Sequence, residues 1–170
     1  MSSPNLPHNP PHNPIDILLD HNLWATRQVL DACAALSPEQ FHRRFEMGVG
    51  SLHDTARHIL GAMRVWTDLL AGRAYRPRLE DGPQLAISEL IALLDDAAAD
   101  LKRHAHAHPL DGTVTRERGG RSYTFTRGAV LTHVATHGMH HRAQMLNMLR
   151  HLGVSVLPQS SVVEWCRALS

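Results

Sequence analysis

Apolar residues recur at helical spacing in four long segments of this chain, and glycine, proline and short polar stretches separate the segments. Alanine and leucine total 42 residues against 15 valines and isoleucines, a balance that favours helices over strands. The sequence therefore predicts an all-α fold, a four-helix bundle. Its long helices are expected over residues 15–36, 52–72, 85–106 and, starting at 126 or 128, up to 152.

Residues typical of helix ends support these limits. Ser37, Pro38 and Gln40 match a capping box with proline in the first turn, which predicts a short additional helix after the first long one. Ser51 is the expected N-cap of the second long helix, and Gly153 is expected to end the last one.

A small β-hairpin is expected immediately before the last helix. Residues 113–115 and 122–125 are rich in β-branched and aromatic side chains, and the polar segment between them contains Gly119 and Gly120. A Gly-Gly pair between two such runs is typical of a tight hairpin turn.

The start of the chain differs from the rest in composition. Residues 1–14 contain five prolines, which neither a helix nor a sheet ladder tolerates, so a disordered N-terminal arm is expected there. Residues 15–170 are long enough to bury one core and are expected to form a single domain.

Residues 160–170, SSVVEWCRALS, are expected to pack back on the bundle. Val162, Val163, Trp165 and Leu169 repeat near helical spacing, and the tryptophan has a large apolar area to bury. Cys166 is then expected to be a partly buried thiol without a role in the chemistry.

Composition excludes several classes of protein. The formal net charge is only +1, so no broad attraction to nucleic acid is expected. No apolar run approaches the ~18 residues that span a bilayer, and the N-terminus lacks the basic and apolar parts of a secretory signal. Cys33 and Cys166 lie far apart, which is typical of reduced thiols. We therefore expect a cytoplasmic protein without nucleic-acid or membrane partners.

Histidines are concentrated in the last predicted helix. The chain has 14 histidines, and His133, His137, His140 and His141 fall within nine residues. Side chains four residues apart lie on one helix face, so either the 137/141 pair or the 133/137 pair could offer two imidazoles to one divalent ion. Spacing alone leaves both pairs open, and it equally allows a seam of half-buried polar histidines without a metal.

A third ligand would have to come from another helix. The candidates are His53 and His58 in the second long helix, on opposed faces because they are five residues apart. His58 lies on the inward-leaning side and is the preferred ligand, whereas His53 lies in the first turn, where solvent is expected to reach it. Neutral imidazoles favour zinc, nickel or iron(II) over magnesium or calcium, which prefer oxygen ligands.

Two other metal sites of helical bundles match the sequence poorly. A di-iron carboxylate site needs two Glu-x-x-His repeats, and the chain has this spacing once, from Glu39 to His42. A hemerythrin-like His-x-x-x-Glu pair, His42 and Glu46, lies in a connector instead of a long helix. Neither site is expected here.

Three stretches of the chain form an ordered series of motifs. Residues 21–41 read HNLWATRQVLDACAALSPEQF, residues 48–66 read GVGSLHDTARHILGAMRVW, and residues 133–153 read HVATHGMHHRAQMLNMLRHLG. The last stretch is similar to the pattern His-x-x-x-His-His-Arg-Gly-Gln. Together with the predicted hairpin, these motifs resemble the DinB-like (DinB/YfiT) family over about residues 15–165.

The resemblance implies a four-helix bundle that holds one divalent metal ion through three histidines. These correspond to His58, His137 and His141 in this sequence. The resemblance thereby selects the 137/141 pair, and it leaves His133 and His140 as packing residues or as partners of the ligands.

Two positions depart from the family pattern. Ala143 stands where the family usually has glycine, and Met63 stands where an acidic residue often occurs, so no carboxylate base is assigned. Neither change removes a ligand. Arg142 and Gln144 are expected to make a surface ion pair and a helix-face hydrogen bond.

Three imidazoles leave a metal ion with open positions, as in catalytic sites. The resemblance implies a thiol-dependent S-transferase that uses a low-molecular-weight thiol co-substrate and a small-molecule substrate, or a metal-dependent hydrolase. The alternative is a non-catalytic metal-binding or stress-associated bundle. An enzyme is expected to open above the metal beside Asn22 and Trp66, whereas a closed bundle with four protein ligands would favour the alternative.

A homodimer is also expected. Val65, Trp66 and Leu69 place apolar side chains on more than one side of the second long helix, beyond what one bundle core is expected to cover.

Overall fold

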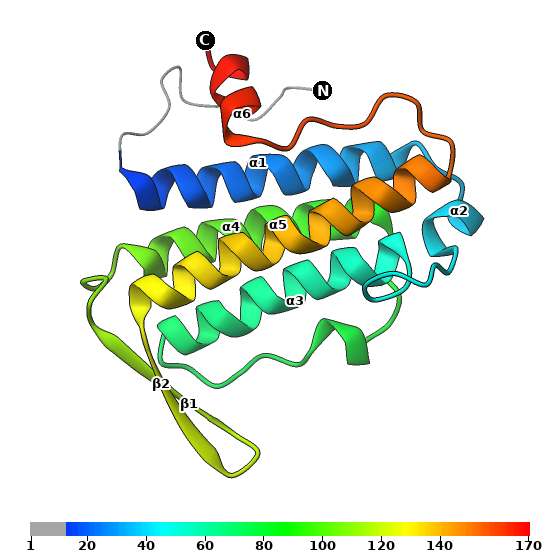
Figure 1. The fold of residues 1–170 in the computed structure, drawn as a ribbon. Coiled ribbons are helices and arrows are strands. Elements are labelled where there is room, and N and C mark those ends of the chain that lie inside the picture. The colour runs from blue at the N-terminus through cyan, green and yellow to red at the C-terminus, as the bar shows by residue number, and fades with distance from the viewer. Residues whose placement is uncertain (1–12) are drawn as a thin grey trace.

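The computed structural model describes residues 13–170, in which four long helices form a bundle with a small hairpin at one end (Figure 1). The elements are α1 (Pro14–Ala34), α2 (Pro38–His42), α3 (Leu52–Leu70), the 3₁₀ turn η1 (Leu79–Asp81), α4 (Ile87–Ala105), β1 (Thr113–Arg118), β2 (Arg121–Thr126), α5 (Arg127–His151) and α6 (Val162–Ala168). Both α1 and α3 pack against α4 and α5. The predicted all-α four-helix bundle is confirmed.

The helix ends are capped by the expected residues. The Ser51 side chain accepts a hydrogen bond from the backbone N–H of Asp54 at 3.0 Å, and Ser37 and Gln40 form the capping box of α2. Gly153 follows the last turn of α5 with a φ of 86°, a left-handed conformation that other residues rarely adopt.

The start of α1 shortens the predicted N-terminal arm. The Asn13 side chain accepts a hydrogen bond from the backbone N–H of Ile15 at 2.9 Å, and Pro14 occupies the first helical position. These two residues therefore belong to the helix start. The rest of the predicted arm, residues 1–12, lies outside the described residues.

The apolar faces of the long helices meet in one core. Leu30, Leu60, Leu94 and Met148 come from the four different long helices, and each is at most 1% exposed. Burying such a side chain stabilises the fold by about 1.5–3 kcal/mol. α3 and α5 both contribute side chains to this core and lie side by side. Side chains at the outer edge of their contact can therefore meet.

The predicted hairpin is present and packs on the end of α3. β1 and β2 pair antiparallel around Gly119 and Gly120, whose positive φ angles form the turn. Phe125 lies edge-on to Trp66, with 5.9 Å between ring centroids, and Leu69 is only 8% exposed. Leu69 was expected to face a second subunit, and that expectation is wrong. It is buried because β1 and the core cover this part of α3.

The C-terminal residues form α6, which packs back on α1 as expected (Figure 1). Trp165 is fully buried against Trp24 and Ala25. Val163 is 61% exposed and Val162 is 36% exposed, so the expectation that both valines join this contact is wrong. The seven residues of α6 form about two turns with only one buried face, and Trp165 occupies it.

The two cysteines are free. Burial raises the pKa of the Cys33 thiol to about 12, which keeps it protonated, and Cys166 is half-buried as predicted. Within residues 13–170, no helix combines the length and the apolar composition that crossing a bilayer requires.

Candidate metal centre

Three histidine side chains from two helices converge at the outer edge of the α3 and α5 contact. His58 comes from α3, and His137 and His141 lie one turn apart on the same face of α5. One ring nitrogen from each residue lies within 4.8 Å of the other two. The structure thus brings together the three residues that were predicted as ligands, and all three are half-buried.

Hydrogen bonds to the outer ring nitrogens orient two of these imidazoles. The Nδ1–H of His58 donates to Oε1 of Glu80 at 3.1 Å, and the Nδ1–H of His141 donates to Oε1 of Gln144 at 2.8 Å. A neutral imidazole with its proton on Nδ1 has a lone pair on Nε2. Both rings are therefore in the tautomer that can offer Nε2 to a metal ion.

The spacing of the nitrogens fits a shared metal ion. Nε2 of His58 and Nε2 of His137 lie 3.2 Å apart. Two nitrogens at ~2.0–2.1 Å from one tetrahedral zinc ion would be roughly 3.3 Å apart. Without an ion, the Nε2–H of His137 donates a hydrogen bond across this gap, and a metal ion would take the place of that proton. The donor set suits a divalent transition metal.

The two imidazoles from α5 favour the neutral form. Burial lowers the pKa of His137 to about 4, and repulsion from the rings of His141 and His58 adds to the effect. Burial likewise lowers the pKa of His141, although the hydrogen bond with Gln144 opposes the shift. Metal ligation requires the deprotonated ring, so these shifts prepare the group for a cation at neutral pH.

Similarity to a known family agrees with this geometry. A family model described as the DinB family matches residues 1–163. The chain belongs to the DinB family. No curated protein matches it. Membership of the family and the three-histidine group both fit a metal-binding protein of the DinB type.

The other histidines of α5 in this DinB-family protein lie outside the group. His133 stands edge-on to Trp66, with 4.9 Å between ring centroids, and it is exposed. Nε2 of His140 accepts a hydrogen bond from Gln144 at 3.0 Å. Among residues 13–170, the three-histidine group has no fourth histidine, cysteine or carboxylate ligand.

His53 is fully buried, so the expectation that solvent reaches it is wrong. Its Nδ1–H donates to Asp54 at 3.2 Å, and its Nε2 accepts the backbone N–H of Leu85 at 3.4 Å. Its ring also lies 4.4 Å from that of His42. The first turn of α3 is covered because α2 and the segment just before α4 pack over it, and both nitrogens of His53 are occupied there.

Two further expectations about the site are wrong. Arg142 is 2% exposed instead of forming a surface ion pair, and it donates to the side chains of Asn22 at 2.5 Å and Thr26 at 3.1 Å. Asn22 therefore lies in this buried contact between α1 and α5 and does not line an opening above the metal group. Burial lowers the pKa of Arg142 to about 10, so the guanidinium remains charged at neutral pH.

Glu80 is the site residue that sequence reasoning missed. It lies in η1, inside a connection rich in proline, glycine and arginine that carries no helical pattern. The one available signal was that Glu80 and Asp81 are the acidic pair of that connection. Nothing local indicates that the connection folds back against His58.

Acidification is expected to destabilise the metal-free protein between about pH 6.5 and 4. The unfolded chain protonates His137 near its ordinary pKa of 6.5, whereas the folded protein does so only near 4. The unfolded state thus binds more protons in this window, and the free energy of unfolding falls as the pH falls. Melting temperatures measured with a chelator from pH 7.5 to 4.5 test this, and His137→Gln should flatten the dependence. An equal slope in both proteins would contradict the assignment.

Proposed function

We propose that this DinB-family protein is a metal-dependent enzyme whose single divalent ion is held by His58, His137 and His141. The observation that supports this proposal is a half-buried group of three imidazoles, to which no fourth histidine, cysteine or carboxylate among the described residues adds a ligand atom. Structural zinc sites are closed by four protein ligands, whereas catalytic sites keep a position open.

The donor set favours zinc, nickel or iron(II) as the metal. Three nitrogen ligands suit a late first-row ion, and magnesium or calcium would be expected to have several carboxylate oxygens. When bound, such an ion acts as a Lewis acid and lowers the pKa of a thiol or water at its open position. We propose a thiol-dependent S-transferase with a low-molecular-weight thiol co-substrate, or a related hydrolase.

Side chains beside the group are suited to a small organic substrate. The rings of His133 and His137 are 5.4 Å apart, and Trp66 adjoins His133. The guanidinium of Arg116 lies 5.0 Å from the Trp66 ring and 5.6 Å from that of Tyr75. This aromatic surface would contact an apolar part of the substrate, and Arg116 would attract an anionic part.

The reaction class is tested by assaying the zinc-, nickel- and iron(II)-loaded protein with electrophiles, each with and without several cellular thiols. Metal-dependent loss of thiol and electrophile together supports the transferase, and thiol-independent cleavage of esters or amides supports the hydrolase. His137→Ala is the matched inactive control. Tight metal binding without turnover of any pair would favour the non-catalytic metal-binding or stress-associated bundle.

We also propose a cytoplasmic homodimer. Val65 and Trp66 stay half-buried on α3 and could extend an interface, although Leu69 cannot. Light scattering of the metal-loaded protein at micromolar concentration is expected to give twice the 18.9 kDa mass of one chain. A mass of one chain would reject the dimer.

A further inference from the structure

The connection between α3 and α4 runs back along α3 before α4 begins (Figure 1). Its residues 73–82, called the strap here, end at the turn η1, close to the metal centre. α3 and α4 run in the same direction, since Asp68 near the end of α3 and Asp100 near the end of α4 both pair with Arg73, so the strap has to return along α3 before α4 can begin. Buried hydrogen bonds hold it at two points.

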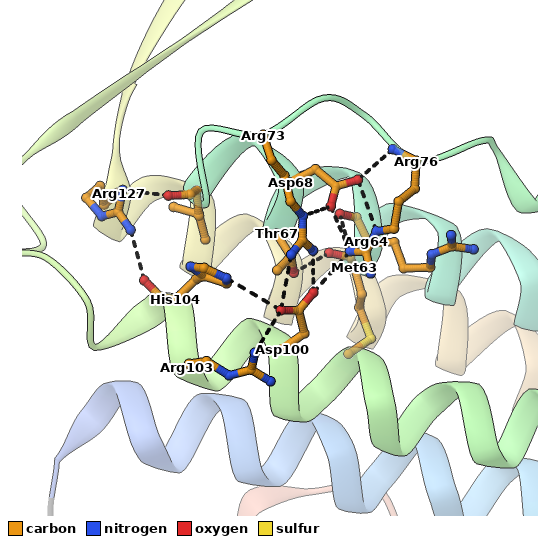
Figure 2. A network of polar contacts seen from close by, with 11 residues as sticks. Met63, Arg64, Thr67, Asp68, Arg73, Arg76, Asp100, Arg103, His104 and Arg127 are labelled. Atoms are coloured by element: carbon orange, nitrogen blue, oxygen red, sulfur yellow. Dashed lines mark hydrogen bonds and ion pairs between the residues drawn. The ribbon is translucent and has the colours of Figure 1, made fainter.

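The first anchor is Asp68, a fully buried carboxylate near the end of α3 (Figure 2). It accepts hydrogen bonds from Nε of Arg73 at 2.7 Å and from the backbone N–H of Arg76 at 2.9 Å. Arg73 also pairs with Asp100 of α4, and Arg76 donates to the carbonyl of Arg64 at 3.1 Å. This network ties the first half of the strap to α3 and α4.

The second anchor is Arg57, which is 6% exposed and lies one residue before the ligand His58. Its guanidinium donates to the backbone carbonyls of Leu79 and of Gly82, the latter at 2.9 Å. These two carbonyls flank Glu80 in the turn. Arg57 therefore holds the backbone on both sides of the carboxylate that contacts His58.

The surface of α3 leaves room for that carboxylate at Gly61. A Cβ atom at this position would lie 3.2 Å from Oε2 of Glu80, which is closer than ordinary van der Waals contact. Oε1 of the same group accepts the Nδ1–H of His58 at 3.1 Å. Gly61 thus leaves space for the Glu80 carboxylate, and the anchored turn holds it there. The carboxylate accepts the hydrogen bond of the His58 ring from this position.

We propose that Glu80 is a positioning residue of the metal centre, held by the Arg57 anchor, and that it sets metal affinity by fixing the orientation and tautomer of His58. The inference rests on the proposed metal site and adds a residue that lies outside the ligand helices. A carboxylate behind a histidine ligand orients the ring and makes its other nitrogen a better donor. The Asp68 network fixes the position of the strap, and Arg57 fixes the part of its backbone that carries the Glu80 carboxylate.

The test is competition of zinc between a chelator and the protein variants. Glu80→Ala is expected to weaken zinc binding by roughly 10 to 100-fold. Glu80→Gln, which can still accept the Nδ1–H, should recover part of that loss. Asp81→Ala is the control because Asp81 is 73% exposed in the same turn, and its affinity should equal that of the wild type. The visible spectrum of the cobalt(II) protein should change in Glu80→Ala and not in Asp81→Ala.

Coupling to the anchor is tested in a double-mutant cycle. Arg57→Gln should weaken zinc binding in the wild-type background and cause little further loss in the Glu80→Ala background, because Arg57 acts through Glu80. A wild-type protein that fails to bind zinc would overturn the proposed metal site itself. Wild-type zinc affinity in both Glu80 variants, with unchanged cobalt spectra, would instead overturn the positioning role alone.

Discussion

Replacing His58, His137 or His141 by alanine is expected to weaken metal affinity at least tenfold in each case. Each of these residues offers one nitrogen to a group with no fourth protein ligand among the described residues, so each substitution removes a metal bond outright. Competition titration with a chromophoric chelator measures the effect for zinc and nickel. The folded state of each variant is checked by circular dichroism before the titration.

The neighbouring histidines are the controls for this prediction. His133→Ala, His140→Ala and His53→Ala should each reduce affinity clearly less, because their rings contact Trp66, Gln144 and Asp54 and lie outside the three-histidine group. If His133→Ala abolishes metal binding and the His141→Ala variant still binds normally, the 133/137 pair supplies the ligands. In that case the correspondence with the DinB motif would fail as well.

Trp165→Ala is expected to lower the free energy of unfolding by about 3–5 kcal/mol. The side chain is fully buried against Trp24 and Ala25 and is the main attachment of α6 to the bundle. In a chain of this length, each kcal/mol corresponds to roughly 2–4 °C in melting temperature. Chemical denaturation of the metal-free protein measures the change without a contribution from metal binding.

Val163→Ala is the matched control for the tryptophan. It lies in the same helix but is 61% exposed, so its substitution should change stability by at most about 0.5 kcal/mol. Equal and small effects of the two substitutions would mean that α6 does not contribute to the stability of the bundle. The buried contact with α1 would then have no energetic role in solution.

The predicted helices agree with the structure to within about two residues at most ends, since their signals are local. Ser51 caps α3 and Gly153 ends α5 through contacts within a few residues of each position. The expectations that failed concern the burial of side chains, which depends on long-range packing. Leu69 and His53 were expected near solvent, and both are buried because elements distant in sequence cover them.

The metal group was only partly predictable from spacing. Helical periodicity placed His133 and His141 equally well as partners of His137, and the motif resemblance selected His141. Glu80 had no periodic signal at all, because a residue in an irregular connection is placed by whatever anchors the backbone around it. Here that anchor is Arg57, 23 residues earlier in the chain.

The sequence by itself determined the helices, the hairpin and the residue types that a metal ion would require. These features depend on side-chain periodicity, capping and turn propensity, which act over a few residues. The tertiary structure decided that His58 meets His137 and His141, that Glu80 stands behind His58, and that Arg142 is buried. Those contacts depend on how α3, α5 and the strap rotate and pack against one another, and that packing is a property of the whole core.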